Sequence, residues 1–521
     1  MKNIKTYFVI ILLCICPFLY AQKNIGGKPY SFDKEFNVKN VKRNTYPEVE
    51  LAKLDMQKIV AEDKINDSTL QPFRYGIAVE VDLNLDNSGE WLTLEDGNRI
   101  WRLRIHCPEA KSIHFTYDKF WIPTGGVLYI CDNNKTTYIG GFNEENNQGI
   151  KEKPSKYVTG LIFSDVVVLE YFEPKEVMHE SIISISNVIY GYRDMPDENN
   201  LRGFGDAPCS VNINCSPEGD DWQQEKTSVA KILMSGWLCS GSLINNTRYD
   251  GTPYFLTACH CMDSNNCRDE NNLDADASYF IFYWDYESSE CVNGVNFTPP
   301  STAGAIIKAN GALSDFALLE LKETPYELKP QVRAYFNGWD RRVPLGKTVG
   351  IHHPKGDIKK ISIDNDSPYT VNNNLWWVHW SSLPNGNSIL YGGSSGSPLY
   401  NNEKKVIGQA YAIAGENCSS QSAFYGRFDV SWNSNGSAPE RKLSTWLDPD
   451  STNVMFLDGT FCQPRNIIGK TINANTTIKS CGDINVQDVE VQSGKLTLDA
   501  AGTTKIISNF KVDLGAQLEI K

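Results

Sequence analysis

Three short segments, far apart in the chain, carry residue types that together could break an acyl bond. Thr257-Ala-Cys-His-Cys261 offers an imidazole, Ser314-Asp-Phe316 places a carboxylate before an apolar strand, and Gly393-Ser-Ser-Gly-Ser-Pro398 surrounds a serine with small residues. Serine is a weak nucleophile until a histidine takes its proton, and an aspartate holds that histidine in the useful tautomer. Histidine, aspartate and serine in this chain order predict an acyl-transfer site.

The chemistry of such a site assigns a role to each residue. Ser395 is the expected nucleophile, His260 the base and then the acid, and Asp315 the residue that orients the imidazole. The backbone amides of Gly393 and Ser395 are the expected donors to the developing oxyanion. Losing one such donor typically costs about 10²–10³ in rate.

Each segment also has a simpler interpretation when it is taken alone. A loop rich in glycine and serine is commonly only a flexible turn, and an aspartate at the start of a strand is commonly a cap. Ser394 and Ser397 compete with Ser395 for the role of nucleophile, and the Ser-Gly-x-Pro order favours Ser395. The order and spacing of all three segments together favour the catalytic interpretation.

A zinc site is the main alternative for the histidine segment. Cys259, His260, Cys261 and Cys267 are residue types that bind zinc. Ligands adjacent in sequence point in divergent directions, however, and exported thiols tend to oxidise. The pair His352-His353 is expected to be structural. The chain is therefore expected to need no metal or other cofactor.

The first 21 residues predict a signal peptide. Lys2 and Lys5 precede an apolar run, and Ala21 offers a small residue for cleavage. No later stretch is long and apolar enough to span a membrane, so a secreted protein without a transmembrane segment is expected. The formal net charge of −13 argues against nucleic acid as a partner, because a phosphate-binding face needs clustered Lys and Arg.

Residues 22–205 predict a propeptide whose β domain begins at about residue 75. Before that point the chain is polar with little periodicity, which predicts a loose arm. Beyond it apolar and charged residues alternate, as in residues 101–105, with the period of a half-buried strand, and no helix is expected. Asp96-Gly97 is a strong signal for a hairpin turn.

A polar stretch rich in turn residues, over residues 194–206, follows this domain. It predicts the exposed segment at which a zymogen is processed, and Arg202-Gly203 is the expected bond. A plain linker between two domains is the alternative.

Residues 206–460 again show short strands and turns, and they predict the catalytic domain. One helix is expected near its end. Ser437 and Glu440 form a capping box, and apolar residues within 443–447 fall on one face. Pro449 would end that helix.

Residues 461–521 predict a small C-terminal β module. Val491-Gln-Ser-Gly494 and Val512-Asp-Leu-Gly515 are similar units one short repeat apart, and each leads into an alternating strand. The segment is too brief for a full solenoid. Its role could be attachment to a surface or to a glycan, sorting for secretion, or capping of an exposed edge, and the sequence favours none of these.

The cysteines of an exported chain are expected to pair. Two pairs would each be local to one region: Cys107 with Cys131, and Cys462 with Cys481. Removing a bridge typically costs about 2–5 kcal/mol of stability.

Residues 209–458 resemble the bacterial lysyl endopeptidases, which are secreted serine proteases of the chymotrypsin fold. The matching runs are residues 239–246, 254–258, 314–316, 338–342, 352–354, 393–398, 425–427 and 443–449, and residues 101–105 resemble the family's propeptide. The resemblance implies an all-β catalytic domain of two chymotrypsin-like β-barrels with the catalytic residues in the cleft between them. It also implies the bridges Cys209–Cys418, Cys215–Cys291 and Cys239–Cys261, with Cys259 and Cys267 left to pair with each other.

The chain departs from that family in the pocket that receives the substrate side chain. Ala423 stands where the family has the aspartate that binds lysine, and Tyr411 replaces a histidine of the same pocket. A buried ammonium without a carboxylate partner is costly. A pocket lined by Tyr411 and Ala423 is therefore expected to accept an uncharged or aromatic side chain, although Glu416 could reach into it.

These observations predict a secreted serine endopeptidase that acts on extracellular proteins or peptides. It would be made as a zymogen with its own propeptide as inhibitor. The alternative is a protein of the protease fold that binds or adheres without cleaving. A third interpretation, a zinc-dependent hydrolase, depends on the cysteine and histidine cluster.

Overall fold

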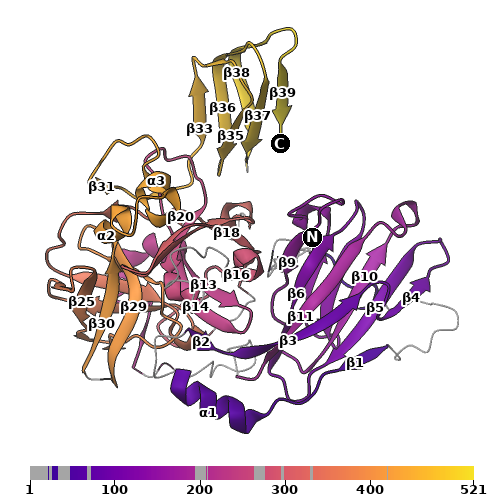
Figure 1. The fold of residues 1–521 in the computed structure, drawn as a ribbon, viewed down its shortest axis with the longest axis horizontal. Coiled ribbons are helices and arrows are strands. Elements are labelled where there is room, and N and C mark those ends of the chain that lie inside the picture. Colours follow the sequence, from indigo (N-terminus) through magenta and orange to yellow (C-terminus); the bar gives the residue numbers. More distant parts are fainter. Residues whose placement is uncertain are drawn as a thin grey trace, which may run out of the picture.

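The fold is built almost wholly from β-strands (Figure 1). The computed structural model describes residue 22 and residues 26–32, 47–66, 72–193, 207, 209–262, 276–294, 299–328, 332–418, 420–500 and 502–521. The expected all-β class is confirmed, with the chymotrypsin-like pair of sheets in the central region, which we define as residues 209–461. The expected signal peptide and the expected processing bond Arg202-Gly203 lie outside the described residues.

The N-terminal region, residues 22–193, contains two sheets, drawn in indigo to purple in Figure 1. The first has the order β1-β5-β10-β7-β8, with β4 beside β5, and the second has the order β3-β11-β6-β9. Their strands are β1 (Glu48–Glu50), β3 (Gly76–Asn84), β4 (Glu90–Thr93), β5 (Arg99–His106), β6 (Ser112–Trp121), β7 (Val127–Asp132), β8 (Tyr138–Phe142), β9 (Ser155–Val158), β10 (Val166–Glu173) and β11 (Ile182–Gly191).

The hairpin signal is confirmed by the turn between β4 and β5. The amide of Leu94 donates to the carbonyl of Asn98 at 2.7 Å, and Gly97 has a φ of +90°, which glycine adopts without strain. Strand β5 is not half-buried as expected, because Arg102 is only 4% exposed and pairs with Glu170 of β10 at 3.2 Å. Both faces of β5 are therefore covered.

Two other expectations for the N-terminal region are wrong. Helix α1 (Met56–Asn66) lies in the segment expected to be a loose arm, where Asp63 is buried beside Arg74. Cys107 and Cys131 are free, buried thiols. The reason is topological: β10 lies between β5, which Cys107 follows, and β7, which holds Cys131. Two strand spacings are about 9.6 Å, which is too far for a bridge.

The central region holds one sheet in the order β17-β16-β13-β14-β15-β19-β18 and another in the order β12-β23-β22-β28-β29-β30-β25-β24. The first sheet consists of β2 (Phe73–Arg74), which comes from the N-terminal region and pairs with β14, and of β13 (Val229–Met234), β14 (Trp237–Leu243), β15 (Tyr254–Ala258), β16 (Phe280–Tyr283), β17 (Ser301–Ala303), β18 (Ala305–Gly311) and β19 (Phe316–Leu321).

Apart from β12, the strands of the second sheet follow those of the first in sequence, and the serine segment immediately precedes its strand β28. It consists of β12 (Val211–Asn212), β21 (Trp339–Asp340), β22 (Thr348–His352), β23 (Lys360–Asp364), β24 (Tyr369–Val371), β25 (Leu375–His379), β28 (Pro398–Tyr400), β29 (Val406–Asn417), β30 (Ser420–Arg427) and β31 (Phe456–Leu457). Two small pairs complete the region: β20 (Tyr335–Phe336) with β32 (Thr460–Phe461), and β26 (Ser382–Leu383) with β27 (Gly386–Asn387).

The helix expected near residues 437–449 is mostly wrong. Its first part is a single 3-10 turn, Pro439–Arg441, without a side-chain cap, and Lys442 is extended with a φ of −150°. Only the short helix α3 (Ser444–Leu447) follows. An additional helix, α2 (Phe428–Asn433), packs Trp432 near Trp339, with ring centroids 4.6 Å apart. Helix α2 is thereby packed into the apolar core of the central region.

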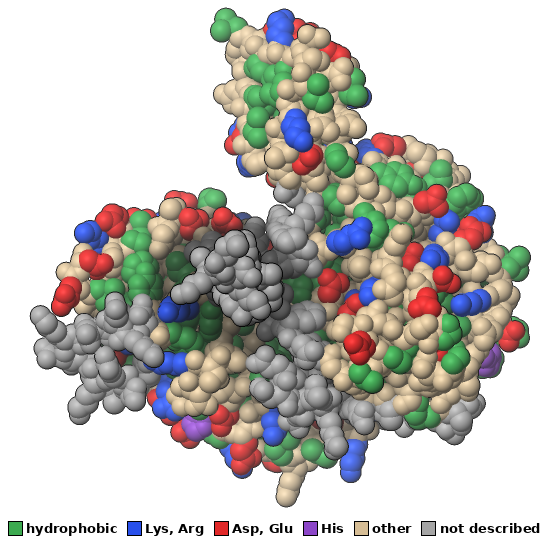
Figure 2. Space-filling view, turned by 180° about the vertical axis from the view of Figure 1, so that it is seen from behind, with side chains coloured by type: hydrophobic (Ala, Val, Ile, Leu, Met, Phe, Trp, Pro, Cys, Tyr) green, Lys and Arg blue, Asp and Glu red, His purple; other side chains and the backbone are tan. Residues whose placement is uncertain are grey.

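The C-terminal module, residues 462–521, projects from the rest of the molecule (Figures 1 and 2). Its strands pair in parallel, and Val491 and Val512 of the two similar units are partners in register. The strands are β33 (Arg465–Ile468), β34 (Thr471–Ile472), β36 (Ile484–Val491) and β38 (Thr504–Val512) in one sheet and β35 (Thr476–Ser480), β37 (Lys495–Ala500) and β39 (Gln517–Ile520) in another. The module is therefore a short stack of repeats, and the predicted bridge Cys462–Cys481 at its base is confirmed.

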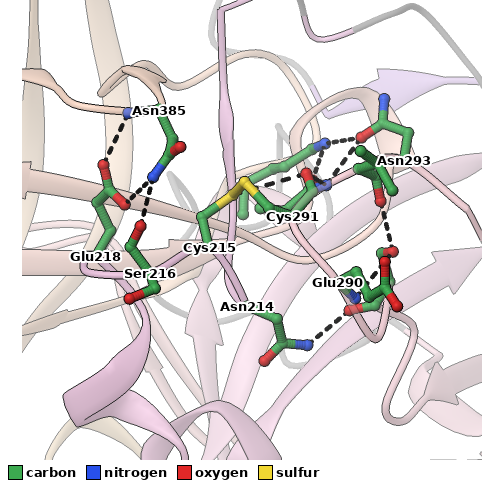
Figure 3. The surroundings of a disulfide bond; sticks show 12 residues. Asn214, Cys215, Ser216, Glu218, Glu290, Cys291, Asn293 and Asn385 are labelled. Atoms are coloured by element: carbon green, nitrogen blue, oxygen red, sulfur yellow. Dashed lines mark hydrogen bonds between the residues drawn. A yellow bond between two sulfur atoms is a disulfide. The ribbon is translucent and has the colours of Figure 1, made fainter.

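Three further predicted bridges are confirmed in the central region: Cys209–Cys418, Cys215–Cys291 and Cys239–Cys261. Figure 3 shows the second of them within a network of polar contacts. There Asn385 donates to Glu218 at 2.7 Å and to the carbonyl of Ser216 at 2.8 Å. The start of the central region is thereby fixed both covalently and by hydrogen bonds.

No helix within the described part of the chain combines the length and the hydrophobicity that a membrane crossing requires.

Candidate active site

His260 and Asp315 meet because two neighbouring strands end together. Strands β15 and β19 are antiparallel, and Ala258, the last residue of β15, lies opposite Phe316, the first residue of β19. The turn after β15 therefore faces the residue before β19. Nδ1 of His260 lies 2.7 Å from Oδ2 of Asp315, and the amide of His260 donates to Oδ1 at 2.9 Å. The amide of Cys259 also donates to the carbonyl of Asp315 at 2.9 Å.

This two-point contact fixes the imidazole. Because Asp315 accepts from both the main chain and Nδ1 of His260, the Nδ1–H tautomer is favoured and Nε2 is left as the proton acceptor. Among the described residues, the buried Nε2 has no hydrogen-bond partner. Asp315 has a φ of +53°, a left-handed backbone that costs a non-glycine residue free energy and is typical of functional sites.

Disulfides hold the histidine turn in place and remove the zinc alternative. Cys261 is bridged to Cys239 of β14, and Cys259 is also disulfide-bonded. Its expected partner, Cys267, lies outside the described residues. Sulfurs engaged in disulfides are not the thiolates that bind zinc.

The serine loop packs directly against the strands that carry the histidine. The amide of Ser240 in β14 donates to the carbonyl of Ser395 at 2.8 Å, and the amide of Gly396 donates to Ala410 of β29 at 2.8 Å. A Cβ atom on Gly396 would lie 2.1 Å from Oγ1 of Thr257, so only glycine permits this approach. Ser395 is therefore held between the two sheets, close to the turn that contains His260.

The loop leaves two amides unused, and they are the two predicted oxyanion donors. The amides of Ser394, Gly396 and Ser397 all donate to main-chain carbonyls. Within the described part of the chain, the amides of Gly393 and Ser395 donate to no acceptor. Gly393 has a φ of +93°, which turns the loop sharply. The arrangement leaves both donors available for a substrate oxygen.

Of the three serines in the loop, Ser395 is the most accessible. Ser394 is 1% exposed and its Oγ lies 2.8 Å from Nδ1 of His352, while Ser397 is fully buried. Ser395 is partly exposed. In the described structure its hydroxyl makes no hydrogen bond to Nε2 of His260, and such catalytic bonds commonly tighten only when a substrate binds.

His352 and His353 contact the serine loop and its neighbour Ser240, which agrees with the structural role expected for this pair. Burial, with the nearby Lys360, lowers the pKa of His352 to about 3, so its ring is neutral and bonds Ser394 and Ser362. The amide of His353 donates to Oγ of Ser240 at 3.0 Å, and that hydroxyl donates to the carbonyl of Gly393 at 2.8 Å. Sequence reasoning missed Ser240, although it lies within a run that matches the family.

The two predicted pocket residues lie in different surroundings. The ring of Tyr411 is 6.1 Å from that of His260, edge to face. Ala423 is fully buried in an apolar cluster with Trp376, Val378 and Tyr425. The side chain of Glu416 lies outside the described residues. Gln421 of β30, which sequence reasoning also missed, donates from its amide nitrogen to the carbonyl of Leu390 at 2.8 Å and so contacts the segment that leads into the serine loop.

Comparisons with known proteins give one consistent result. Residues 204–426 match the model of the family "Lysyl endopeptidase, C-terminal domain". The chain is 26% identical over 366 residues to the lysyl endopeptidase of Pseudomonas aeruginosa. This alignment covers 63% of the chain and 71% of that protein.

Solved structures also match the chain, among them the following two, both of low similarity. One is an inactive form of Rv3671c from M. tuberculosis, with 14% identity, a TM-score of 0.25, and coverage of 42% of this chain and 91% of that one. The other is a Glu endopeptidase in complex with MPD, with 16% identity, a TM-score of 0.26, and coverage of 42% and 93%.

Proposed function

Because residues 204–426 belong to the lysyl endopeptidase family, we propose that the chain is a secreted serine endopeptidase that uses Ser395, His260 and Asp315. The observation that carries this proposal is the two-point contact between His260 and Asp315, at 2.7 and 2.9 Å. It prepares Nε2 to take a proton and supports the imidazolium that results.

In the proposed reaction, Oγ of Ser395 attacks the scissile carbonyl carbon while Nε2 of His260 takes the hydroxyl proton. The oxyanion that forms accepts hydrogen bonds from the amides of Gly393 and Ser395. The imidazolium then gives its proton to the leaving amine, which leaves an ester between substrate and Ser395. Water attacks that ester by the same sequence and releases the acid.

The primary pocket is proposed to accept an uncharged or aromatic side chain. Ala423 carries no carboxylate and packs in an apolar cluster with Trp376, Val378 and Tyr425, so a lysine ammonium at this position would lack the charged partner that it needs. A profile of cleavage over a peptide library tests this directly. A strong preference for lysine at the cleaved bond would overturn it.

The N-terminal region is proposed to be the propeptide, and export is proposed from the leader pattern. The disulfides fit an extracellular protein. The C-terminal module, which projects from the rest of the molecule in Figure 2, is proposed to serve attachment to a surface.

Labelling with a fluorophosphonate tests the catalytic proposal. We expect the label on Ser395, and we expect it to be lost in Ser395→Ala but kept in the control Ser437→Ala, since Ser437 is exposed. If the processed protein takes no label, the chain is a binding protein of the protease fold, and the proposed function is wrong.

A further inference from the structure

A strand of the N-terminal region pairs with the catalytic sheet. Strand β2 is antiparallel to β14, with Phe73 opposite Leu238 and Arg74 opposite Trp237. The amide of Tyr75 extends the contact by donating to the carbonyl of Gly236 at 2.8 Å. Leu238 immediately precedes Cys239, whose bridge to Cys261 flanks His260, so this pairing takes place beside the catalytic turn.

The side chain of Phe73 reaches the serine loop. It is 6% exposed, and its Cδ2 would lie 3.4 Å from a Cβ atom on Gly392. The next residue, Gly393, approaches Leu238 so closely that a Cβ atom there would lie 2.7 Å from Cδ1 of the leucine. Phe73 thus packs against the residue that precedes one of the two oxyanion donors.

The position of β2 relative to the pocket indicates which half of a substrate it replaces. The loop that carries Ser395 bonds to β14 on one side, through Ser240, and to β29 on the other, through Ala410. The pocket residues Tyr411 and Ala423 belong to the β29 side. A substrate whose acyl half fills that pocket would extend its leaving half over β14, where β2 lies.

A cluster of charged and polar groups holds β2 rigidly. The guanidinium of Arg74 donates to Asp63 at 2.8 Å and to Glu62 at 2.9 Å, both in helix α1. Tyr192 donates to Asp63 at 2.8 Å, and Arg193 pairs with it at 2.7 Å. Arg74, Asp63 and Tyr192 are each less than 10% exposed.

Both residues of β2 also face cation and ring partners. The guanidinium of Arg193 lies 4.2 Å from the ring centroid of Phe73, and that of Arg74 lies 5.6 Å from the ring of Trp237. A peptide fixed in its bound conformation loses little entropy on binding, which strengthens its binding. This cluster is therefore suited to hold an inhibitory segment in place.

We propose that β2 is an intramolecular inhibitory strand that occupies the leaving-group side of the catalytic cleft. This inference rests on the proposed function, and it also describes the substrate. An extended polypeptide adds to the edge of β14 through its main chain, as in other strand-addition complexes. A large apolar side chain at the position of Phe73 packs on Gly392 and Leu238.

The test compares two substrates on the full, unprocessed chain. One is an internally quenched peptide that extends on both sides of the cleaved bond, with its acyl side taken from the library profile. The other is a chromogenic substrate with the same acyl side and no residue beyond the bond. Active sites are counted by fluorophosphonate titration, so each rate is expressed per reactive Ser395.

We expect Phe73→Ala with Arg74→Ala to raise turnover of the extended peptide by about tenfold or more, which corresponds to about 1.4 kcal/mol of lost inhibition. Turnover of the short substrate should change by less than about twofold, since that substrate does not reach β14. The matched control is Phe172→Ala with Arg104→Ala, which changes the same residue types in β10 and β5, and it should leave both rates unchanged.

The outcomes separate this inference from the proposed function. Label on Ser395 with no gain on the extended peptide, or an equal gain in the control, overturns the inhibitory strand and leaves the protease proposal intact. Absence of label in every processed protein overturns both.

A cross-link provides a second test if the alanine variants fold poorly. Arg74 and Trp237 are directly opposed, so Arg74→Cys with Trp237→Cys is placed to form a disulfide. The oxidised protein should remain inactive on the extended peptide after its linker is cut, and mild reduction should restore activity. Wild-type protein in the same reductant is the control. Full activity of the cross-linked form would show that β2 does not block the site.

Discussion

The N-terminal and central regions are both β-rich, but within the described residues only the central region adds disulfides to its noncovalent contacts. The central region carries the bridges Cys209–Cys418, Cys215–Cys291 and Cys239–Cys261. The N-terminal region keeps Cys107 and Cys131 as thiols, and burial raises the pKa of each to about 12.

Both regions contain buried ion pairs, such as Lys360 with Asp357 at 3.3 Å in the central region, but the described part of the N-terminal region has them without disulfides. Arg102 pairs with Glu170 at 3.2 Å, and Arg99 pairs with Glu173, with all four side chains at most 10% exposed. The disulfides are therefore found in the central region, which is the part proposed to remain after the zymogen is processed. The region proposed to be discarded depends on noncovalent contacts, which can be lost once the linker is cut.

The largest expected effect belongs to the catalytic pair, which only the central region contains. Asp315→Asn should lower kcat by about 10⁴, because the amide favours the wrong tautomer of His260. Steady-state kinetics on a cleaved peptide measures this. The control Asp450→Asn changes an exposed aspartate that pairs with Arg248, and it should leave kcat unchanged. A loss of less than tenfold in Asp315→Asn would contradict the assigned role.

Breaking a buried ion pair should have the next largest effect, and it should fall on the N-terminal region. Glu170→Ala removes the partner of Arg102 and should cost about 3–5 kcal/mol, since a buried charge is left uncompensated. Chemical denaturation followed by fluorescence measures the change. Glu176→Ala, in an exposed turn of the same region, is the control, and equal losses in both would show that the pair contributes nothing special.

Removing one bridge should destabilise the central region by a similar or smaller amount. Cys239→Ala with Cys261→Ala should cost about 2–5 kcal/mol and lower Tm. The matched control is Cys107→Ala with Cys131→Ala, which removes the same atoms without a bridge. If the control loses as much stability as the bridge variant, the disulfide itself does not stabilise the central region.

Acid should weaken the N-terminal region through His114, as it should weaken the central region through His352. Burial lowers the pKa of His114 to about 3, and its Nε2 lies 2.8 Å from the hydroxyl of Tyr75, next to β2. The unfolded state, with a pKa of about 6.5, binds a proton that the folded state refuses, so stability falls as the pH drops from about 6.5 toward 3. Limited proteolysis against pH should show this loss, and His114→Gln should reduce it. An unchanged pH profile in that variant would contradict the assignment.

The smallest effect is expected at the surface of the central region. Arg248 and Asp450 pair at 2.5 Å but are 47% and 54% exposed, so Arg248→Ala should cost less than about 1 kcal/mol. Thermal unfolding measures it. A larger loss would mean that this exposed ion pair stabilises the central region as much as a disulfide does.

Local patterns predicted the parts of the molecule that depend on neighbouring residues. The presence of strand β5, though not the burial of both its faces, the turn at Gly97 and the repeats around Val491 and Val512 are each set within a short segment. The resemblance to a family supplied the bridges of the central region. The catalytic roles and the domain boundaries remain predictions.

The failures involve contacts between segments that are distant in sequence. Helix α1 contains Asp63, which bonds Arg74 and Arg193, and no local periodicity reveals that contact. The predicted pairing of Cys107 with Cys131 failed because β10 lies between their strands. The order of strands in a sheet cannot be read from the spacing of residues in the sequence. Strand β2 was not predicted for the same reason: its two residues belong to the N-terminal region but pair with β14 of the central region.

The parallel pairing of the C-terminal module stacks its repeats on one another at the spacing of neighbouring strands. Thr476, Leu496 and Gln517 lie at successive levels, about 20 residues apart in sequence, and Thr476 pairs with Leu496 while Lys495 pairs with Gln517. One further repeat would lengthen the stack by only about 4.8 Å, the distance between neighbouring strands. Evolution can therefore adjust the reach of this module in small, regular steps by duplicating a repeat.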